Sequence, residues 1–212
     1  MAHVLSVNVG RPQLISNGER TEKSSIRKQA VEGRVAVRGV NIEGDDQADR
    51  AVHGGPDKAV YAYAREDTDW WESELGRELP NGMFGENLTT AGIDLSSLRI
   101  GDRFRVGTAV LEVSEPRFPC WKLAARFKDP LMVRRFAKAL RPGAYFRIAR
   151  EGELGAGDEL TLEERAAHHD VTIGFFARAF LEDRSKLELI LAAPISDTWR
   201  HWITALAYSS TK

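Results

Sequence analysis

Cysteine is almost absent from this chain, which has one such residue in 212. A single thiol excludes an intramolecular disulfide and leaves no cysteine framework for zinc or an iron–sulfur cluster. No stretch approaches the ~18 consecutive apolar residues of a membrane span, and the N-terminal MAHVLSVNVG lacks the basic and apolar regions of a signal peptide. We therefore expect a folded protein of the reducing cytoplasm with no membrane partner.

Net charge is nearly absent too, at −1 for the whole chain with a pI of about 6.5. A protein so close to neutral lacks the broad basic surface that a nucleic acid polymer requires. The charge is nevertheless uneven, because residues 114–142 hold eight basic residues against two acidic ones. This excess favours a small phosphorylated ligand near Cys120, and the alternative is the solvated face of a helix.

Short segments of alternating apolar and other residues, separated by glycines, predict a mainly β fold with flanking helices. The expected strands are 3–9, 34–38, 104–106, 110–113, 145–149 and 159–162. Gly107 and Thr108 fit a type II′ turn between the third and fourth of these strands. Helices are expected at 65–75 and 130–140, the second with Asp129 as its cap and Pro130 in its first position. Many short strands with glycine turns favour a sheet curled into a barrel.

The pattern becomes helical after about residue 166. We expect residues 1–165 to form the β domain and residues 166–212 to form a small domain of three helices. Thr172, Ser185 and Ser196 each stand where a hydroxyl can cap one of these helices. A segment of this size is too small to bury a strong core alone, so it must pack on the β domain or on a partner subunit.

The single cysteine, Cys120, lies in the stretch EPRFPCWKL at residues 115–123. A buried structural cysteine usually has small apolar neighbours, whereas this one stands between Pro119 and Trp121 with Arg117 and Lys122 close by. Cations and a helix N-terminus both favour the thiolate, and a helix is expected to begin after Pro119. The surroundings therefore indicate a thiolate that takes part in chemistry.

A second stretch, GDDQADRAVHGGPDKAVYAY at residues 44–63, combines glycines with charged side chains. Gly54 and Gly55 follow His53 and permit positive φ, which lets backbone amides approach an anion closely. Arg50 and Lys58 add positive charge on either side. An ordinary turn between strands would use the same residues, so a structural role is the alternative.

Together with GENL at residues 85–88, these two stretches resemble the MOSC domain, a family related to the C-terminal part of molybdenum cofactor sulfurases, and specifically its bacterial YiiM-like branch. The resemblance covers roughly residues 20 to 160, and the helical tail is similar to a small domain often appended in that branch. It implies a MOSC-like β-barrel that binds the molybdenum cofactor, a molybdenum pyranopterin. Pyridoxal phosphate binding is a further association of the family.

The resemblance implies that Cys120 is a sulfur ligand of the metal and, with His53, a catalytic residue; molybdenum in such cofactors takes soft sulfur ligands. The residues expected to bind the cofactor are Arg50, His53, Gly54, Gly55, Lys58, Asn87, Arg117 and Lys122. Those from the glycine-rich stretch would cradle the phosphate, the two cations near Cys120 would favour its thiolate, and Asn87 would hydrogen-bond the pterin edge. The alternatives are a turn for Asn87, surface charges for Arg50 and Lys58, and a simply buried position for Cys120.

The function that the resemblance implies is reduction of N-hydroxylated compounds, such as hydroxylamino purines or amidoximes, with electrons from a flavin or iron–sulfur donor. The alternative is a sulfur carrier in which Cys120 holds a persulfide destined for a metal centre. A hydrolase that uses Cys120 as nucleophile and His53 as base is a third hypothesis. A homodimer is a further expectation.

Overall fold

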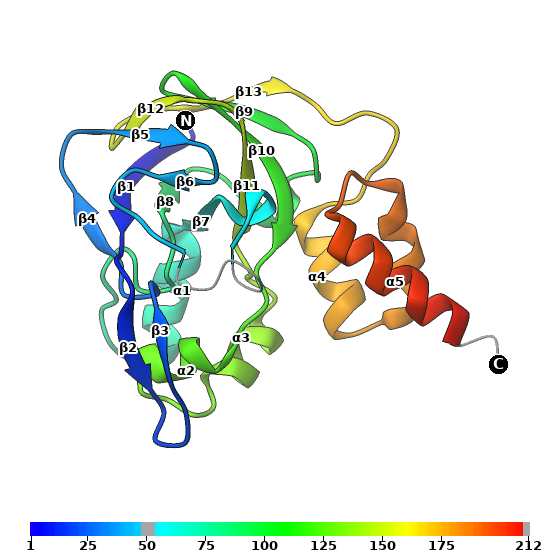
Figure 1. Ribbon diagram of the computed structural model, residues 1–212, viewed down its shortest axis with the longest axis horizontal. Helices are drawn as coiled ribbons and strands as arrows, with labels where there is room; N and C mark the ends of the chain where they lie inside the picture. Colours follow the sequence, from blue (N-terminus) through cyan, green and yellow to red (C-terminus); the bar gives the residue numbers. More distant parts are fainter. Residues whose placement is uncertain (48–53, 210–212) are drawn as a thin grey trace.

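A mixed sheet of eight strands forms the centre of the protein (Figure 1), whose computed structural model describes residues 1–47 and 54–209. Its strands, in spatial order, are β13 (Leu160–Glu164), β9 (Arg103–Val106), β10 (Ala109–Pro116), β11 (Ala144–Arg150), β7 (Val60–Ala64), β8 (Leu88–Ala91), β1 (His3–Val9) and β4 (Gln29–Val31). Two small sheets accompany it, one of β12 (Gly152–Gly155), β5 (Arg34–Arg38) and β6 (Asn41–Ile42), the other of β2 (Gln13–Ser16) and β3 (Thr21–Ser24). The prediction of a mainly β fold is confirmed.

The large sheet curls until its distant strands meet. Strand β1 is near one edge and β13 is the other edge, yet His3 forms a β-bridge with Glu159. The amide of Val4 donates to the carbonyl of Asp158 at 2.9 Å, and a single bridge rather than a full ladder joins these strands. The curled shape agrees with the expected class, although the strand pairings do not describe a closed barrel.

Strands β7 and β8 are parallel neighbours, in contrast to the antiparallel hairpin of β9 and β10. A parallel pair needs a crossover connection, and helix α1 (Arg65–Leu75) supplies it. All five residues of β7 are buried because the strand lies in the middle of the sheet. In the hairpin, φ is +60° at Gly107 but is not positive at Thr108, as the expected type II′ turn requires.

Two expectations about helix starts are wrong. Helix α3 comprises Met132–Ala139, so Pro130 precedes the helix instead of occupying its first position. The Asp129 carboxylate accepts the amide of Leu131 at 2.9 Å and its carbonyl accepts that of Met132 at 3.0 Å. These short-range bonds make a tight turn, which delays the helix.

The second correction concerns Ser185, which does not cap the middle element of the tail. That element is a 3₁₀ helix, η3 (Arg184–Ala192), and its N-cap is Asp183, whose side chain accepts from the amide of Ser185. The other two hydroxyls act as expected: Thr172 caps α4 (Ile173–Leu181), and Ser196 accepts the amide of Trp199 near the start of α5 (Asp197–Ser209).

The helical tail packs on the sheet, as its small size requires (Figure 1). One hydrophobic cluster unites Phe176 of α4 and Ile190 of η3 with Val113 of β10 and Phe146 of β11. Phe118 lies against this tail, with its ring centroid 4.3 Å from that of Phe180 and 5.4 Å from that of Trp199. The division into domains at residues 165 and 166 stays a prediction.

A second hydrophobic cluster lies on the other side of the sheet, where α1 and α3 meet α2 (Trp121–Phe127). Aromatic rings dominate it, with Trp71 stacked on Phe136 at 6.2 Å and Tyr63 stacked on Phe84 at 4.3 Å. This cluster fixes α2 and α3 beneath the sheet and so fixes the segment that carries Cys120. Within the described residues, none of the helices is long and apolar enough to cross a membrane.

Candidate functional site

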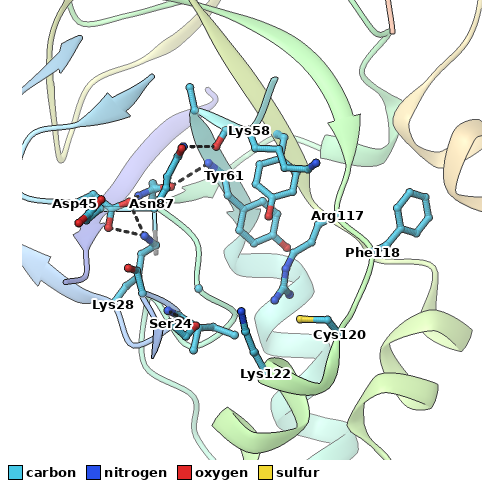
Figure 2. Close-up of a pocket in the computed structure, with 17 residues that line it drawn as sticks. Ser24, Lys28, Asp45, Lys58, Tyr61, Asn87, Arg117, Phe118, Cys120 and Lys122 are labelled. Atoms are coloured by element: carbon cyan, nitrogen blue, oxygen red, sulfur yellow. Dashed lines mark hydrogen bonds and ion pairs between the residues drawn. The ribbon is translucent and has the colours of Figure 1, made fainter. Parts of the chain in front are cut away.

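A pocket opens where the end of β10, the start of α2 and the middle of β7 meet (Figure 2). Further walls come from the connection between β3 and β4, the stretch after β6, the short helix η1 (Pro56–Lys58) and Tyr145 of β11. Five predicted site residues line this pocket: Lys58, Asn87, Arg117, Cys120 and Lys122. The fold therefore brings together residues from stretches that are far apart in the sequence.

Cys120 stands at the N-cap of α2 and is partly exposed. Its side chain makes no capping hydrogen bond to the helix and lines the pocket. Helix α2 has only seven residues, so its dipole is a weaker aid to a thiolate than nearby full charges are. Arg117 is a nearby charge that interacts with Cys120.

Arg117 is a buried cation, with 7% of its surface exposed. Its guanidinium lies over the rings of Tyr61 and Phe136, at 5.3 and 5.5 Å from their centroids. Burial favours loss of its proton, but the neighbouring Tyr61, Tyr145 and Cys120 raise its pKa, so the group stays charged. Its Nη1 is buried and has no hydrogen-bond partner among the described residues. A buried charged donor of this kind is suited to an anionic ligand.

Two tyrosines beside Arg117 stay protonated. Burial raises the pKa of Tyr145 to about 12, although Arg117 opposes the shift. The pKa of Tyr61 is also raised by burial, and its hydroxyl donates to the carbonyl of Pro142 at 2.8 Å. Both side chains line the pocket, so they present aromatic faces and neutral hydroxyls rather than phenolates.

A network of buried polar groups closes the opposite wall of the pocket. Lys28 Nζ contacts both carboxylate oxygens of Asp45, at 2.5 and 2.6 Å. Burial lowers the pKa of Lys28, and Asp45 opposes this shift. Asn87 donates to Asp45 at 2.8 Å and to the carbonyl of Asn8 at 3.3 Å, and it accepts the amide of Tyr61 at 3.1 Å. The side-chain amide of Asn87 therefore donates hydrogen bonds to other groups of the protein. Its contact with a cofactor stays a prediction.

The remaining two cations of the pocket each have a carboxylate partner. Lys122 Nζ lies 3.1 Å from Glu22 of the β2–β3 hairpin, and Lys58 Nζ lies 3.3 Å from the buried Glu115. Burial raises the pKa of Glu115, while Lys58 opposes the shift. Lys58 thus neutralises a buried acid as well as facing the pocket.

The glycine-rich stretch is described only in part. Gly54 and Gly55 precede η1 outside the pocket lining, and Gly55 has φ of +91°. Its amide donates to the side chain of Gln47 at 2.9 Å. Arg50 and His53 lie outside the described residues, so their predicted roles stay predictions. Within the described part of the chain, no group of three or more His, Cys, Asp or Glu side chains is placed to hold a metal ion.

Residues 49–161 match the MOSC domain, and the chain belongs to that family. YflK of Bacillus subtilis (strain 168) is 40% identical over 201 residues, which cover 93% of this chain and 90% of YflK. The crystal structure of YiiM from Geobacillus stearothermophilus has a TM-score of 0.80 and 30% identity, and the match covers 97% of this chain and 98% of that one. The protein is a YiiM-like member of the family, as its motifs predict.

A further relative is a Gibberella moniliformis (strain M3125 / FGSC 7600) protein named "Reductase". It is 37% identical over 168 residues, which cover 76% of this chain but 29% of that much longer protein. The likeness therefore concerns one part of the fungal protein.

Several pocket residues were not predicted from the sequence, notably Lys28, Asp45, Tyr61 and Tyr145. Asp45 and Tyr61 lie within the quoted glycine-rich stretch, but nothing local marks them as pocket residues. Lys28 lies in SSIRKQAV (residues 24–31), where nothing local marks it as a pocket residue either.

Proposed function

We propose that this protein is a molybdenum-cofactor-dependent reductase of N-hydroxylated compounds. Membership of the MOSC family supports a molybdenum-cofactor-binding domain, and the fungal relative's name supports a reductase. The observation that carries the proposal is the buried, charged Arg117, whose Nη1 is unpartnered beside the partly exposed thiol of Cys120. A soft sulfur ligand and a donor for an anion are what a molybdenum dithiolene with a phosphate tail requires.

The residues of the pocket fit that group. Cys120 would hold the metal through its thiolate, and Arg117 would stabilise both this thiolate and a nearby anionic group. Lys122 adds positive charge at the same wall. When bound, the cofactor supplies two-electron redox chemistry, so that R–NHOH, two electrons and two protons give R–NH₂ and water. The protein's contribution is orientation and control of access.

Tyr61 and Tyr145 would orient the substrate, because their rings line the pocket and Tyr145 keeps its proton at neutral pH. A protonated hydroxyl donates a hydrogen bond to the oxygen that the reaction removes. The electrons come from a flavin or iron–sulfur donor protein. The cytoplasmic location, the homodimer and the pyridoxal phosphate association stay predictions.

The test is elemental analysis of protein expressed in a host that makes the cofactor. We expect stoichiometric molybdenum in the wild type and none in Cys120→Ser, together with loss of hydroxylamine reduction in that variant. Retention of metal and turnover by Cys120→Ser would refute the ligand role. Sulfane sulfur on Cys120 in metal-free protein, found by mass spectrometry after incubation with a desulfurase and its substrate, would instead favour the persulfide carrier.

A further inference from the structure

The outward face of α3 carries a row of cations with one apolar residue at its N-terminal end. We name it the basic stripe, and its members are Leu131, Arg134, Arg135 and Lys138. Their spacing of three, four and seven residues places them on one side of the helix. All four are exposed, and Leu131 keeps 56% of its surface in solvent. The opposite side, with Met132 and Phe136, is buried against the aromatic cluster.

The positive charge of the basic stripe is poorly balanced. Arg135 Nη1 lies 3.4 Å from Asp129, whereas Arg134 and Lys138 form no ion pair within residues 1–47 and 54–209. Like charges three and four residues apart on a helix repel each other. The arrangement is therefore unfavourable for the free protein, and an acidic surface placed against it would relieve the repulsion.

The side of α3 opposite the basic stripe contacts a residue that lines the pocket. Phe136 lies on the inner side of α3, and the guanidinium of Arg117 lies over its ring, 5.5 Å from the centroid. Arg117 in turn lines the pocket beside Cys120. The diameter of a helix with its side chains is ~10–12 Å. Figure 1 shows α3 next to α2, below the large sheet. A redox centre held against the outer side of α3 would thus lie a short way from the pocket.

We propose that the basic stripe is the docking surface for the acidic face of an electron-donor protein. The inference rests on the proposed function, because a reductase must receive two electrons for each R–NHOH that it converts. The chain's one cysteine is too few for an iron–sulfur cluster of its own, so a reduced flavin or iron–sulfur protein supplies the electrons and leaves oxidised.

An exposed apolar residue at the end of a row of cations suits a transient protein complex. The charges steer the partner and raise the association rate, while the apolar residue is buried in the complex. Nucleic acid is the competing occupant of a basic helix. The near-neutral charge of the whole chain argues against it, since binding to a phosphate backbone relies on a broad basic surface.

The experiment uses a purified acidic flavodoxin as the probe. Its binding to the 212-residue chain is measured by calorimetry at low and high salt, for the wild type, for Arg134→Glu/Lys138→Glu and for the matched control Arg38→Glu/Arg105→Glu. The control makes the same change of charge at exposed positions of β5 and β9. We expect about tenfold weaker binding or more in the stripe variant at low salt, little change in the control, and a smaller difference at high salt.

A second pair of measurements separates docking from chemistry. Turnover of an N-hydroxylated substrate is followed with reduced flavodoxin and with reduced methyl viologen, which needs no docking surface. The stripe variant should lose turnover with flavodoxin and keep it with viologen. Leu131→Asn should weaken flavodoxin binding several-fold at every salt concentration, since the contact that it removes is apolar.

Three outcomes would overturn the docking surface: no salt-dependent flavodoxin binding by the wild type, equal losses in the stripe and control variants, or duplex DNA bound more tightly than flavodoxin through the same residues. Failure of molybdenum-loaded wild type to turn over with viologen would refute the proposed function instead. In that case the flavodoxin affinities measured by calorimetry would still test whether the basic stripe is a docking surface.

Discussion

Replacement of Arg117 by methionine should leave the stability of the fold nearly unchanged and should weaken ligand binding. Arg117 is buried and charged, and its Nη1 has no partner among the described residues. Methionine fills a similar elongated space without a donor. Residues placed for function are often unfavourable for the stability of the free protein, so their removal can leave stability unchanged or raise it.

The magnitudes follow from the contacts of the guanidinium. An unpaired buried donor costs ~1–3 kcal/mol, and more when it is charged. Its removal is offset by loss of the contacts with the rings of Tyr61 and Phe136, each a cation–π interaction of about 0.5–2 kcal/mol. We therefore expect the free energy of unfolding of Arg117→Met to equal that of the wild type within about 1 kcal/mol.

The affinity for the cofactor should fall much more than the stability does. Loss of a charge-assisted hydrogen bond to the anionic cofactor is worth ~1.5–3 kcal/mol, or about a tenfold to hundredfold weaker hold. The assay pairs urea unfolding of metal-free protein with molybdenum content after expression in a host that makes the cofactor. Arg77→Met is the control, because Arg77 lies over the ring of Phe127 at 5.7 Å but is exposed.

The reasoning fails if Arg117→Met unfolds far more readily than the wild type while it retains full molybdenum. Such a result would make Arg117 a structural residue held by its aromatic neighbours. Equal losses of metal in the Arg77 and Arg117 variants would show that the effect is not specific to the pocket.

Three further predictions concern single residues. Cys120→Ser should be as stable as the wild type or more so by ~0.5 kcal/mol, because serine is a good N-cap and the thiol makes no capping bond; thermal unfolding checks this, and a large loss of stability would contradict it. Lys58→Met should destabilise the protein at pH 8 and much less at pH 4. Burial raises the pKa of Glu115, so the contribution of this carboxyl to stability is full at low pH and is lost as rising pH ionises it, which is when the Lys58 ammonium is needed as its partner. Equal losses of unfolding free energy at both pH values would refute this. Gly143→Ala should lower the free energy of unfolding more than Gly76→Ala, and we expect a loss of ~1–2 kcal/mol for Gly76→Ala. Both glycines have positive φ, but a Cβ at Gly143 would lie 2.5 Å from a carbonyl oxygen of β7, whereas a Cβ at Gly76 would meet no atom within 4 Å. Urea unfolding that ranks the two variants the other way would contradict the geometry.

Elements with a strong local signal were predictable from the sequence. The bounds of β1 and α1 agree with the alternation and the helical pattern, and the turn at Gly107 was determined by one glycine between two apolar strands. The delayed start of α3 was not predictable, since a proline after an aspartate fits a helix start and a tight turn equally well. The hydrogen bonds of Asp129 decide between them.

The pocket residues that were predicted all lie in the three stretches that carry the family resemblance. Arg117 was expected as a cation beside the thiol, but its position over Phe136 depends on how α3 packs. The ion pair of Lys28 and Asp45 joins two segments whose contact follows from the tertiary fold alone. Local patterns carry no information on such long-range pairs.

The origin of the pocket in many separate segments also bears on the order of events in folding. Its walls extend from Ser24 to Tyr145, and they meet only when β7, β10 and β11 have paired. Contacts between residues so distant in the chain form late, because loop closure must precede them. A ligand of this pocket therefore has nothing to bind in a partly folded chain. Its stabilisation should slow unfolding and leave the refolding rate unchanged.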